Sequence, residues 1–147
     1  MIQHIDMHAV LQESVSGVYT DLVTRPTGRV VRERIEQAIA GRAGEVTIAR
    51  MDFAGVGCID YSCADEIVAK LLRDRPAVLV LSGITDGHRE AIEPVLTGHG
   101  LAALIEGPDG TLDILGTPEV ALVLLDELVA RRLAVRTPGG TFALTLA

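Results

Sequence analysis

The residues best suited to chemistry lie in the segment GVGCIDYSCADEI, residues 55–67. A phosphate on Ser62 would lie at the N-terminus of a predicted helix, where free backbone N–H groups and the helix dipole favour an anion. The same serine can instead cap the helix, because the run SCAD that begins there has the Ser-x-x-acid order of a capping box. Asp65 disfavours a phosphate, since a nearby carboxylate repels it. We expect Ser62 to cap the helix, with a phosphorylation site as the alternative.

The cysteines and histidines are spaced too loosely to predict a metal centre. Cys58 and Cys63 are separated as C-x4-C, and His4 and His8 as H-x3-H, whereas a structural zinc site uses tighter cysteine pairs and four ligands. A helix N-terminus lowers the pKa of a thiol, which makes Cys63 a candidate nucleophile. Asp65 opposes that effect, and no histidine is close to Cys63 in sequence. We expect both cysteines to be small, reduced core residues.

Four carboxylates, those of Asp52, Asp60, Asp65 and Glu66, could hold a magnesium ion if the fold brought them together. A receiver-type phosphoacceptor site would also need a lysine after a later strand. The only lysine is Lys70, in the middle of a predicted helix. The last two acids are better explained as charges in the first helical turn. The sequence therefore predicts no catalytic constellation, no metal and no cofactor.

The elements that must position these residues alternate between strand and helix patterns. Residues 1–14 form a short helix or an arm, and 16–24 a weak strand. Three further helices are expected before residue 107. One ends near Gly41, one covers 63–73, and one covers 86–99 and is capped by Asp86. The expected strands cover 45–53, 77–82 and 101–105. This alternation predicts an α/β domain with a mixed or mostly parallel sheet.

The pattern changes after residue 107. Thr117 is a predicted N-cap with Pro118 at the first helical position, and the helix continues to about Arg132. The runs 133–137 and 141–146 flank Pro-Gly-Gly and predict a β-hairpin. Helix and hairpin resemble part of a winged helix, so we divide the chain into domains 1–107 and 108–147. The second contains five acids and three arginines, which disfavours DNA binding.

The run MDFAGVGCIDYSCADEIVAKLL, residues 51–72, resembles the centre of a STAS domain, the fold of anti-sigma factor antagonists and sulfate-transporter tails. It is closer still to STAS-like bacterial domains of uncharacterised role, and the order of elements matches over about 15–107. In the antagonists, Asp-Ser-Ser-Gly-Leu carries a serine phosphorylated by a GHKL-type ATPase, which the unphosphorylated form captures. Asp60 corresponds to the Asp, Tyr61 to the first Ser and Ser62 to the phosphorylated Ser. Cys63 and Ala64 replace Gly-Leu.

Composition limits the remaining functional classes. The 147 residues are 48% hydrophobic and carry a net charge of −7, which allows a sizeable core and disfavours binding to nucleic acid or to an anionic membrane. The sequence contains no predicted signal peptide or transmembrane segment, so we expect a cytoplasmic protein. The composition also allows the protein to form homo-oligomers.

These observations predict a non-catalytic STAS-like regulatory or protein-interaction domain whose partner is a GHKL-type ATPase or another signalling protein. The expected partner surface consists of Asp60, Tyr61, Cys63, Asp65 and Glu66. One alternative is a transcription-associated module whose winged half contributes to DNA binding. A third is a small-molecule sensor or enzyme that uses Asp60 and Ser62 in a crevice at the strand ends.

Overall fold

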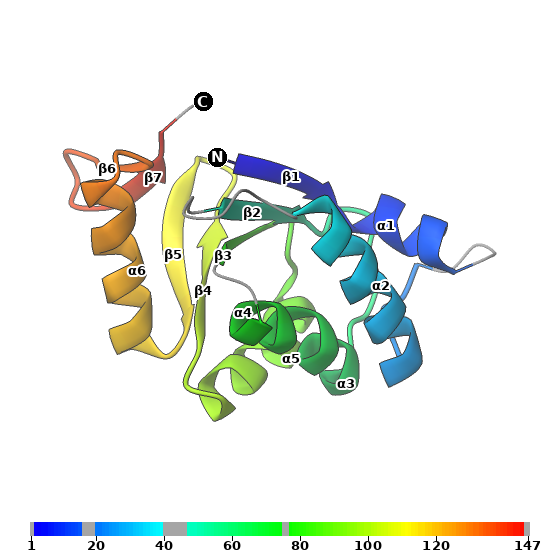
Figure 1. The fold of residues 1–147 in the computed structure, drawn as a ribbon. Helices are drawn as coiled ribbons and strands as arrows, with labels where there is room; N and C mark the ends of the chain where they lie inside the picture. Colours follow the sequence, from blue (N-terminus) through cyan, green and yellow to red (C-terminus); the bar gives the residue numbers. More distant parts are fainter. Residues whose placement is uncertain (1, 16–19, 40–46, 75–76, 146–147) are drawn as a thin grey trace.

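The structure is a computed structural model and describes residues 2–15, 20–39, 47–74 and 77–145. Part of the strand predicted over 16–24 lies outside these residues. Within 20–24 the chain makes only an isolated bridge between Leu22 and Ile59, so the predicted strand is wrong there. The predicted α/β class is confirmed for the described residues, which form helices around one curled sheet (Figure 1).

The sheet has the strand order β1-β2-β3-β4-β5-β7-β6. The first four strands in this order are parallel, and the remaining pairs are antiparallel. The sequence did not predict β1, which lies in a segment expected to be a short helix or an arm, or β5, which lies in a segment for which no element was predicted. The strands are β1 (Ile2–Asp6), β2 (Thr47–Asp52), β3 (Ala77–Ser82), β4 (Ala102–Glu106), β5 (Thr111–Gly116), β6 (Ala134–Arg136) and β7 (Phe142–Leu144).

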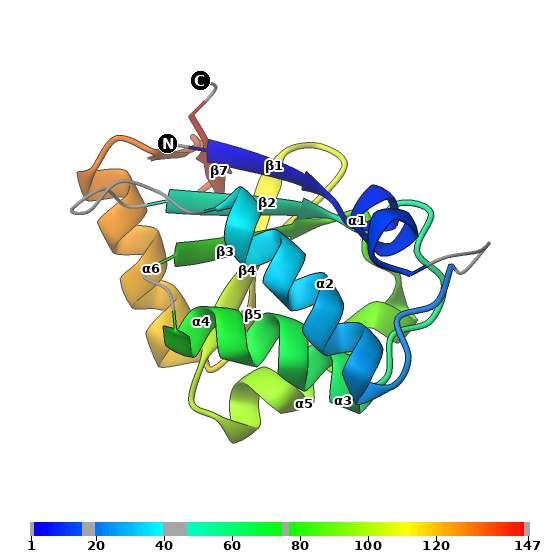
Figure 2. The ribbon, with the colours of Figure 1, turned by 45° about the vertical axis from the view of Figure 1, so that its right-hand side comes forward.

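Helices cover both faces of the sheet, but more of them lie on one face than on the other. Helices α1 to α5 lie against one face, here called the inner face, and α6 packs on β4, β5 and β6 from the outer face (Figures 1 and 2). The segments α3, η1 and α4 form one continuous helix with a π-helical middle. The helical segments are α1 (Met7–Ser14), α2 (Arg25–Ala38), α3 (Tyr61–Ala64), η1 (Asp65–Ala69), α4 (Lys70–Asp74), α5 (Asp86–Gly98) and α6 (Pro118–Ala130).

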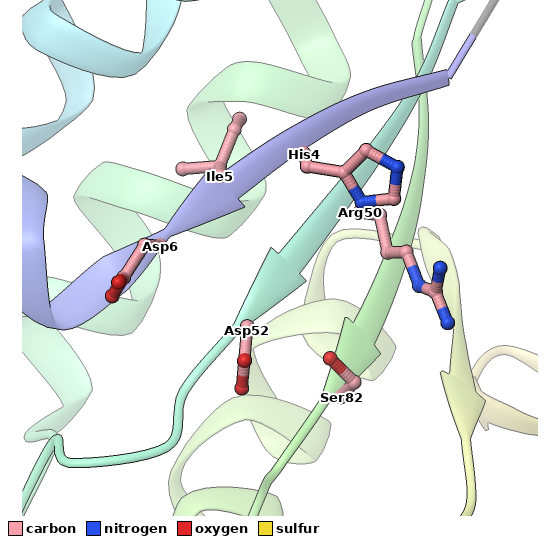
Figure 3. Close-up of a pocket in the computed structure, with 6 residues that line it drawn as sticks. All are labelled: His4, Ile5, Asp6, Arg50, Asp52 and Ser82. Atoms are coloured by element: carbon pink, nitrogen blue, oxygen red, sulfur yellow. The ribbon is translucent and has the colours of Figure 1, made fainter.

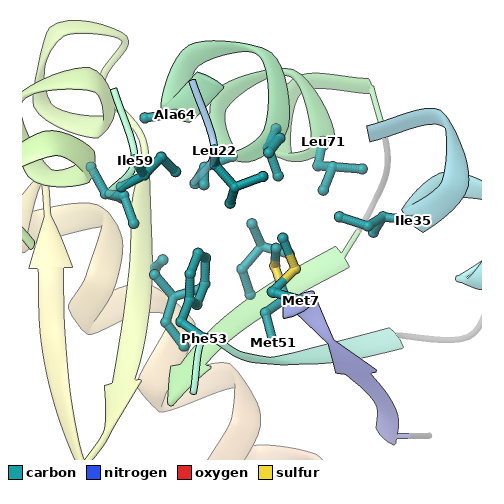
Figure 4. Packing of buried hydrophobic residues seen from close by; sticks show 14 of the residues in the cluster. Met7, Leu22, Ile35, Met51, Phe53, Ile59, Ala64 and Leu71 are labelled. Atoms are coloured by element: carbon teal, nitrogen blue, oxygen red, sulfur yellow. The ribbon is translucent and has the colours of Figure 1, made fainter. Parts of the chain in front are cut away.

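Strand alternation produces two separate hydrophobic cores. Ala49 and Met51 of β2 point to the inner core with Phe53, which packs among the residues of α1 to α5 (Figure 4). Ile48 of the same strand points to the outer core, together with Leu125 of α6. Because successive side chains of a strand face opposite sides, the parallel strands are apolar on both faces where helices cover them. None of the helices among the described residues is long and apolar enough to cross a membrane.

The C-terminal helix and hairpin share the sheet with the rest of the chain. β7 pairs with β5, and β5 pairs with β4, so the proposed boundary at residue 107 falls in the turn between two paired strands. Thr117 occupies the N-cap position of α6 without a side-chain hydrogen bond. The cap predicted at Asp86 is wrong, because Thr85 caps α5 and forms a capping box with His88.

Candidate functional site

The predicted site lies at the start of α3, and its cap is Asp60 rather than Ser62. Asp60 Oδ1 accepts a hydrogen bond from the backbone N–H of Cys63 at 2.8 Å. The helix therefore begins at Tyr61, and Ser62 lies inside its first turn. The predicted cap at Ser62 and the capping box with Asp65 are both wrong. The short side chain of Asp, like that of Ser, reaches the backbone N–H three residues further on. Both residue types therefore suit the N-cap position.

Asp60 also joins two distant parts of the chain. Its Oδ2 accepts from the backbone N–H of Thr24 at 3.0 Å, and its Oδ1 accepts from the Ser62 hydroxyl at 2.9 Å. Burial opposes ionisation of Asp60, but the N–H groups of Cys63 and Thr24 and the hydroxyl of Ser62 outweigh it and lower its pKa. The carboxylate is thus held ionised and in one position.

A network of charges lies behind the helix start. Glu66 is fully buried and accepts from Arg25 at 2.9 Å and from Lys70 at 2.7 Å. Asp65 accepts from Arg25 at 2.8 Å, and its other oxygen lies 2.9 Å from Nε2 of His99. Burial opposes ionisation of both acids, but these partners lower the pKa of each. Through these contacts the two carboxylates connect α2, η1 and the C-terminal end of α5.

Close helix contact explains why Glu66 is buried. A Cβ built on Gly28 of α2 would lie 3.0 Å from Cβ of Glu66 and 3.1 Å from Cα of Cys63. Glycine thus allows α2 to approach the π-helical segment closely, and the carboxylate of Glu66 is enclosed. Arg32 of α2 adds a longer ion-pair contact, with Nε 3.5 Å from Oε2 of Glu66. The prediction that Asp65 and Glu66 are simple first-turn charges misses this contact with α2.

Cys63 is not suited to nucleophilic chemistry. Its side chain is fully buried, and Sγ lies 3.0 Å from the carbonyl oxygen of Thr24. Burial, followed by the negative charge of Asp60, raises the pKa of the thiol to about 12. Cys58 is exposed, so only one of the two predicted core cysteines lies in the core.

Only part of the predicted partner surface is accessible. The side chain of Tyr61 is 60% exposed, and Asp60 and Asp65 reach the surface in part. Cys63 and Glu66 have no exposed surface, so the predicted partner surface is wrong at these two residues. Burial could not be foreseen for Glu66 from its own segment, because two of the side chains that contact it, Arg25 and Arg32, lie on α2.

Known proteins provide no assignment for this site. Comparison of the chain with known protein families, with curated proteins and with solved structures finds no match. Among the described residues, no group of three or more histidines, cysteines and acids is arranged to hold a metal ion. The site must therefore be interpreted from its own geometry.

A second polar feature appears only in the structure. The parallel strands end in Asp6, Asp52, Ser82 and Glu106, which lie in register as neighbours. We call these four residues the strand-end row. They share the outer face with the apolar residues of the outer core. Figure 3 shows Asp52 and Ser82 at the ends of adjacent strands, beside a cavity.

Proposed function

We propose that this chain is a non-catalytic, STAS-like regulatory domain that binds a protein partner through the start of α3. The observation that carries the proposal is the 60% exposure of the Tyr61 side chain on a helix start capped by Asp60. Aromatic side chains contribute a large share of the binding energy in protein interfaces, because they bury much area with little loss of conformational freedom. The resemblance of residues 51–72 to STAS domains supports the same surface.

The residues near Tyr61 on the helix are fixed by contacts with other segments of the chain. Asp60 is bonded to the backbone of Thr24, and Asp65 is bonded to Arg25 and contacts His99. A surface that is already ordered loses less entropy when a partner binds. The helix start is therefore suited to present an aromatic side chain between two carboxylates, a pattern that favours a partner with an apolar pocket and nearby positive charge.

The resemblance to anti-sigma factor antagonists suggests that the partner is a GHKL-type ATPase and that Ser62 is its phosphorylation site. The structure supplies a physical reason for such a switch. The Ser62 hydroxyl donates to Asp60 Oδ1 at 2.9 Å, and a phosphate ester at that oxygen has no proton to donate. It would also bring negative charge next to Asp60 and Asp65. Phosphorylation would therefore weaken the helix cap and the partner surface together.

The proposal is tested by calorimetric titration of the chain with the purified GHKL-type ATPases encoded in the same genome. We expect one of them to bind, and Tyr61→Ala to weaken that binding by about 30-fold or more, the loss of about 2 kcal/mol typical of an interface hot spot. Leu122→Ala is the matched control, because Leu122 is 54% exposed on α6, away from this surface.

Two results would contradict the binding surface, and one would contradict phosphorylation of Ser62. Absence of binding by every ATPase, or unchanged affinity in Tyr61→Ala, would contradict the proposed surface. Incubation of the pair with ATP followed by mass spectrometry tests Ser62. An unmodified Ser62 in a complex that still depends on Tyr61 would remove the switch and leave the binding surface in place.

A further inference from the structure

The outer face of the sheet forms a trough beside the strand-end row. Three adjoining cavities of about 370, 380 and 490 Å³ lie along it. The first two share His4 and Arg50, and the second is lined by β1 on one side and by residues 143–145 on the other. The curl of the sheet thus brings β7 opposite β1, and Arg50 and Glu106 line the space between them.

An ion pair between Arg50 and Glu106 lies at the centre of the trough. The Glu106 side chain is only 8% exposed and that of Arg50 is 33% exposed. The Arg50 guanidinium therefore stays partly in contact with solvent, and the pair places one positive and one negative charge on the lining of the trough. The pair also lies where the sheet changes from parallel to antiparallel pairing, next to the carboxyl ends of the strands, a frequent location of ligand sites in α/β folds.

Two polar side chains of the trough have unused bonding capacity, whereas Asp6 Oδ1 accepts from the backbone N–H of Ala9 at 3.1 Å and caps α1. Asp52 Oδ1 accepts from the backbone N–H of Ala54 at 2.9 Å, and Oδ2 makes no further hydrogen bond within the described chain. The Ser82 hydroxyl likewise bonds to no other described residue. Figure 3 shows both side chains, with Asp6 and His4 on the neighbouring strand. Donors and acceptors therefore line the same space.

The charge of the lining selects the ligand. The trough contains the carboxylates of Asp6, Asp52 and Glu106 against the single guanidinium of Arg50, so its formal charge is −2 with His4 neutral. We propose that the trough binds a small hydroxylated amine of the size of an amino sugar. Its ammonium group would lie near Asp6 and Asp52, and its hydroxyl groups would bond to Ser82 and to the ion pair. This site does not depend on the proposed function at Tyr61.

The test is an NMR titration of the ¹⁵N-labelled chain with glucosamine, with N-acetylglucosamine as the matched ligand that lacks the charge. We expect glucosamine to shift the amide signals of His4, Arg50, Asp52 and Ser82 and N-acetylglucosamine to shift them far less. Asp52→Asn retains the acceptor for Ala54 and should weaken glucosamine binding by about tenfold, or 1.4 kcal/mol. Tyr61→Ala should leave it unchanged.

Three outcomes would overturn the inference: no shift at these four amides with glucosamine, an equal response to the uncharged ligand, or unchanged affinity in a folded Asp52→Asn chain. If Asp52→Asn fails to fold, Ser82→Ala replaces it, because the Ser82 hydroxyl makes no bond to the described chain and its loss should leave the fold intact. In that variant a several-fold weaker response is expected, and an unchanged one counts against the trough.

Discussion

Replacement of Asp60 by alanine tests whether this one carboxylate holds the start of α3. The change removes the acceptor for the N–H of Cys63, for the N–H of Thr24 and for the Ser62 hydroxyl. Loss of an N-cap costs about 1 kcal/mol, and a hydrogen bond to a charged group contributes about 1.5–3 kcal/mol. Because these bonds share one side chain and the loop can relax, we expect a total loss of about 2–3 kcal/mol in the free energy of unfolding.

The assay is urea unfolding at pH 7 and at pH 3. The pKa of Asp60 is lowered in the folded state, so the stabilisation is present above the unfolded value near pH 4 and is lost as the pH falls below it. The wild-type chain should therefore approach Asp60→Ala at low pH. Asp60→Asn keeps a good capping side chain but no charge, and should lose about half as much as alanine at pH 7.

Asp86→Ala is the matched control, because Asp86 lies in the first turn of α5 and does not cap it. It should change the stability by no more than about 0.5 kcal/mol. The reasoning is refuted if Asp60→Ala is as stable as this control at pH 7. It is also refuted if the difference between Asp60→Ala and wild type is the same at pH 3 as at pH 7.

Three further predictions concern the helix packing, the buried charge and the two thiols near this site. Gly28→Ala should lower the free energy of unfolding in urea by about 1 kcal/mol, because α2 contacts α3 and η1 tightly at this residue. Gly98→Ala is the control and should raise it slightly, because no atom lies near a Cβ at that position. Equal effects of the two changes would contradict the close approach of the helices. Glu66→Gln should cost about 2–3 kcal/mol, since Arg25 and Lys70 lose a buried partner; a neutral change in the same assay would be contrary evidence. A thiol reagent at pH 8 should modify Cys58 alone in the native chain and both cysteines in urea, and rapid native labelling of Cys63 would argue against its burial.

Much of the fold could be predicted because its signals are local. The strand predicted over 77–82 forms as β3 with the same bounds, and α2 ends at Ala38, near the predicted end, because both signals depend on residues within one segment. β1 and β5 escaped prediction because their segments have weak patterns of their own. β1 is stabilised by pairing with β2, and β5 by pairing with β4 and β7.

The sequence by itself determined that a helix begins near Asp60 and that this start carries the residues of interest. It did not determine which residue caps it, because the choice depends on Thr24, which reaches Asp60 only in the folded chain. Glu66 is buried for the same reason, since its partner Arg25 comes from α2.

The trough depends on tertiary structure most of all. The ends of the four parallel strands meet only when register aligns Asp6 with Asp52 and Ser82 with Glu106. Curling of the sheet then brings β7 opposite β1 beside them. Residue spacing reports which face of an element is apolar, but register and curl arise from contacts between segments far apart in the chain. The helix start at Asp60 could thus be located from sequence, whereas the ligand trough could be recognised only in the folded molecule.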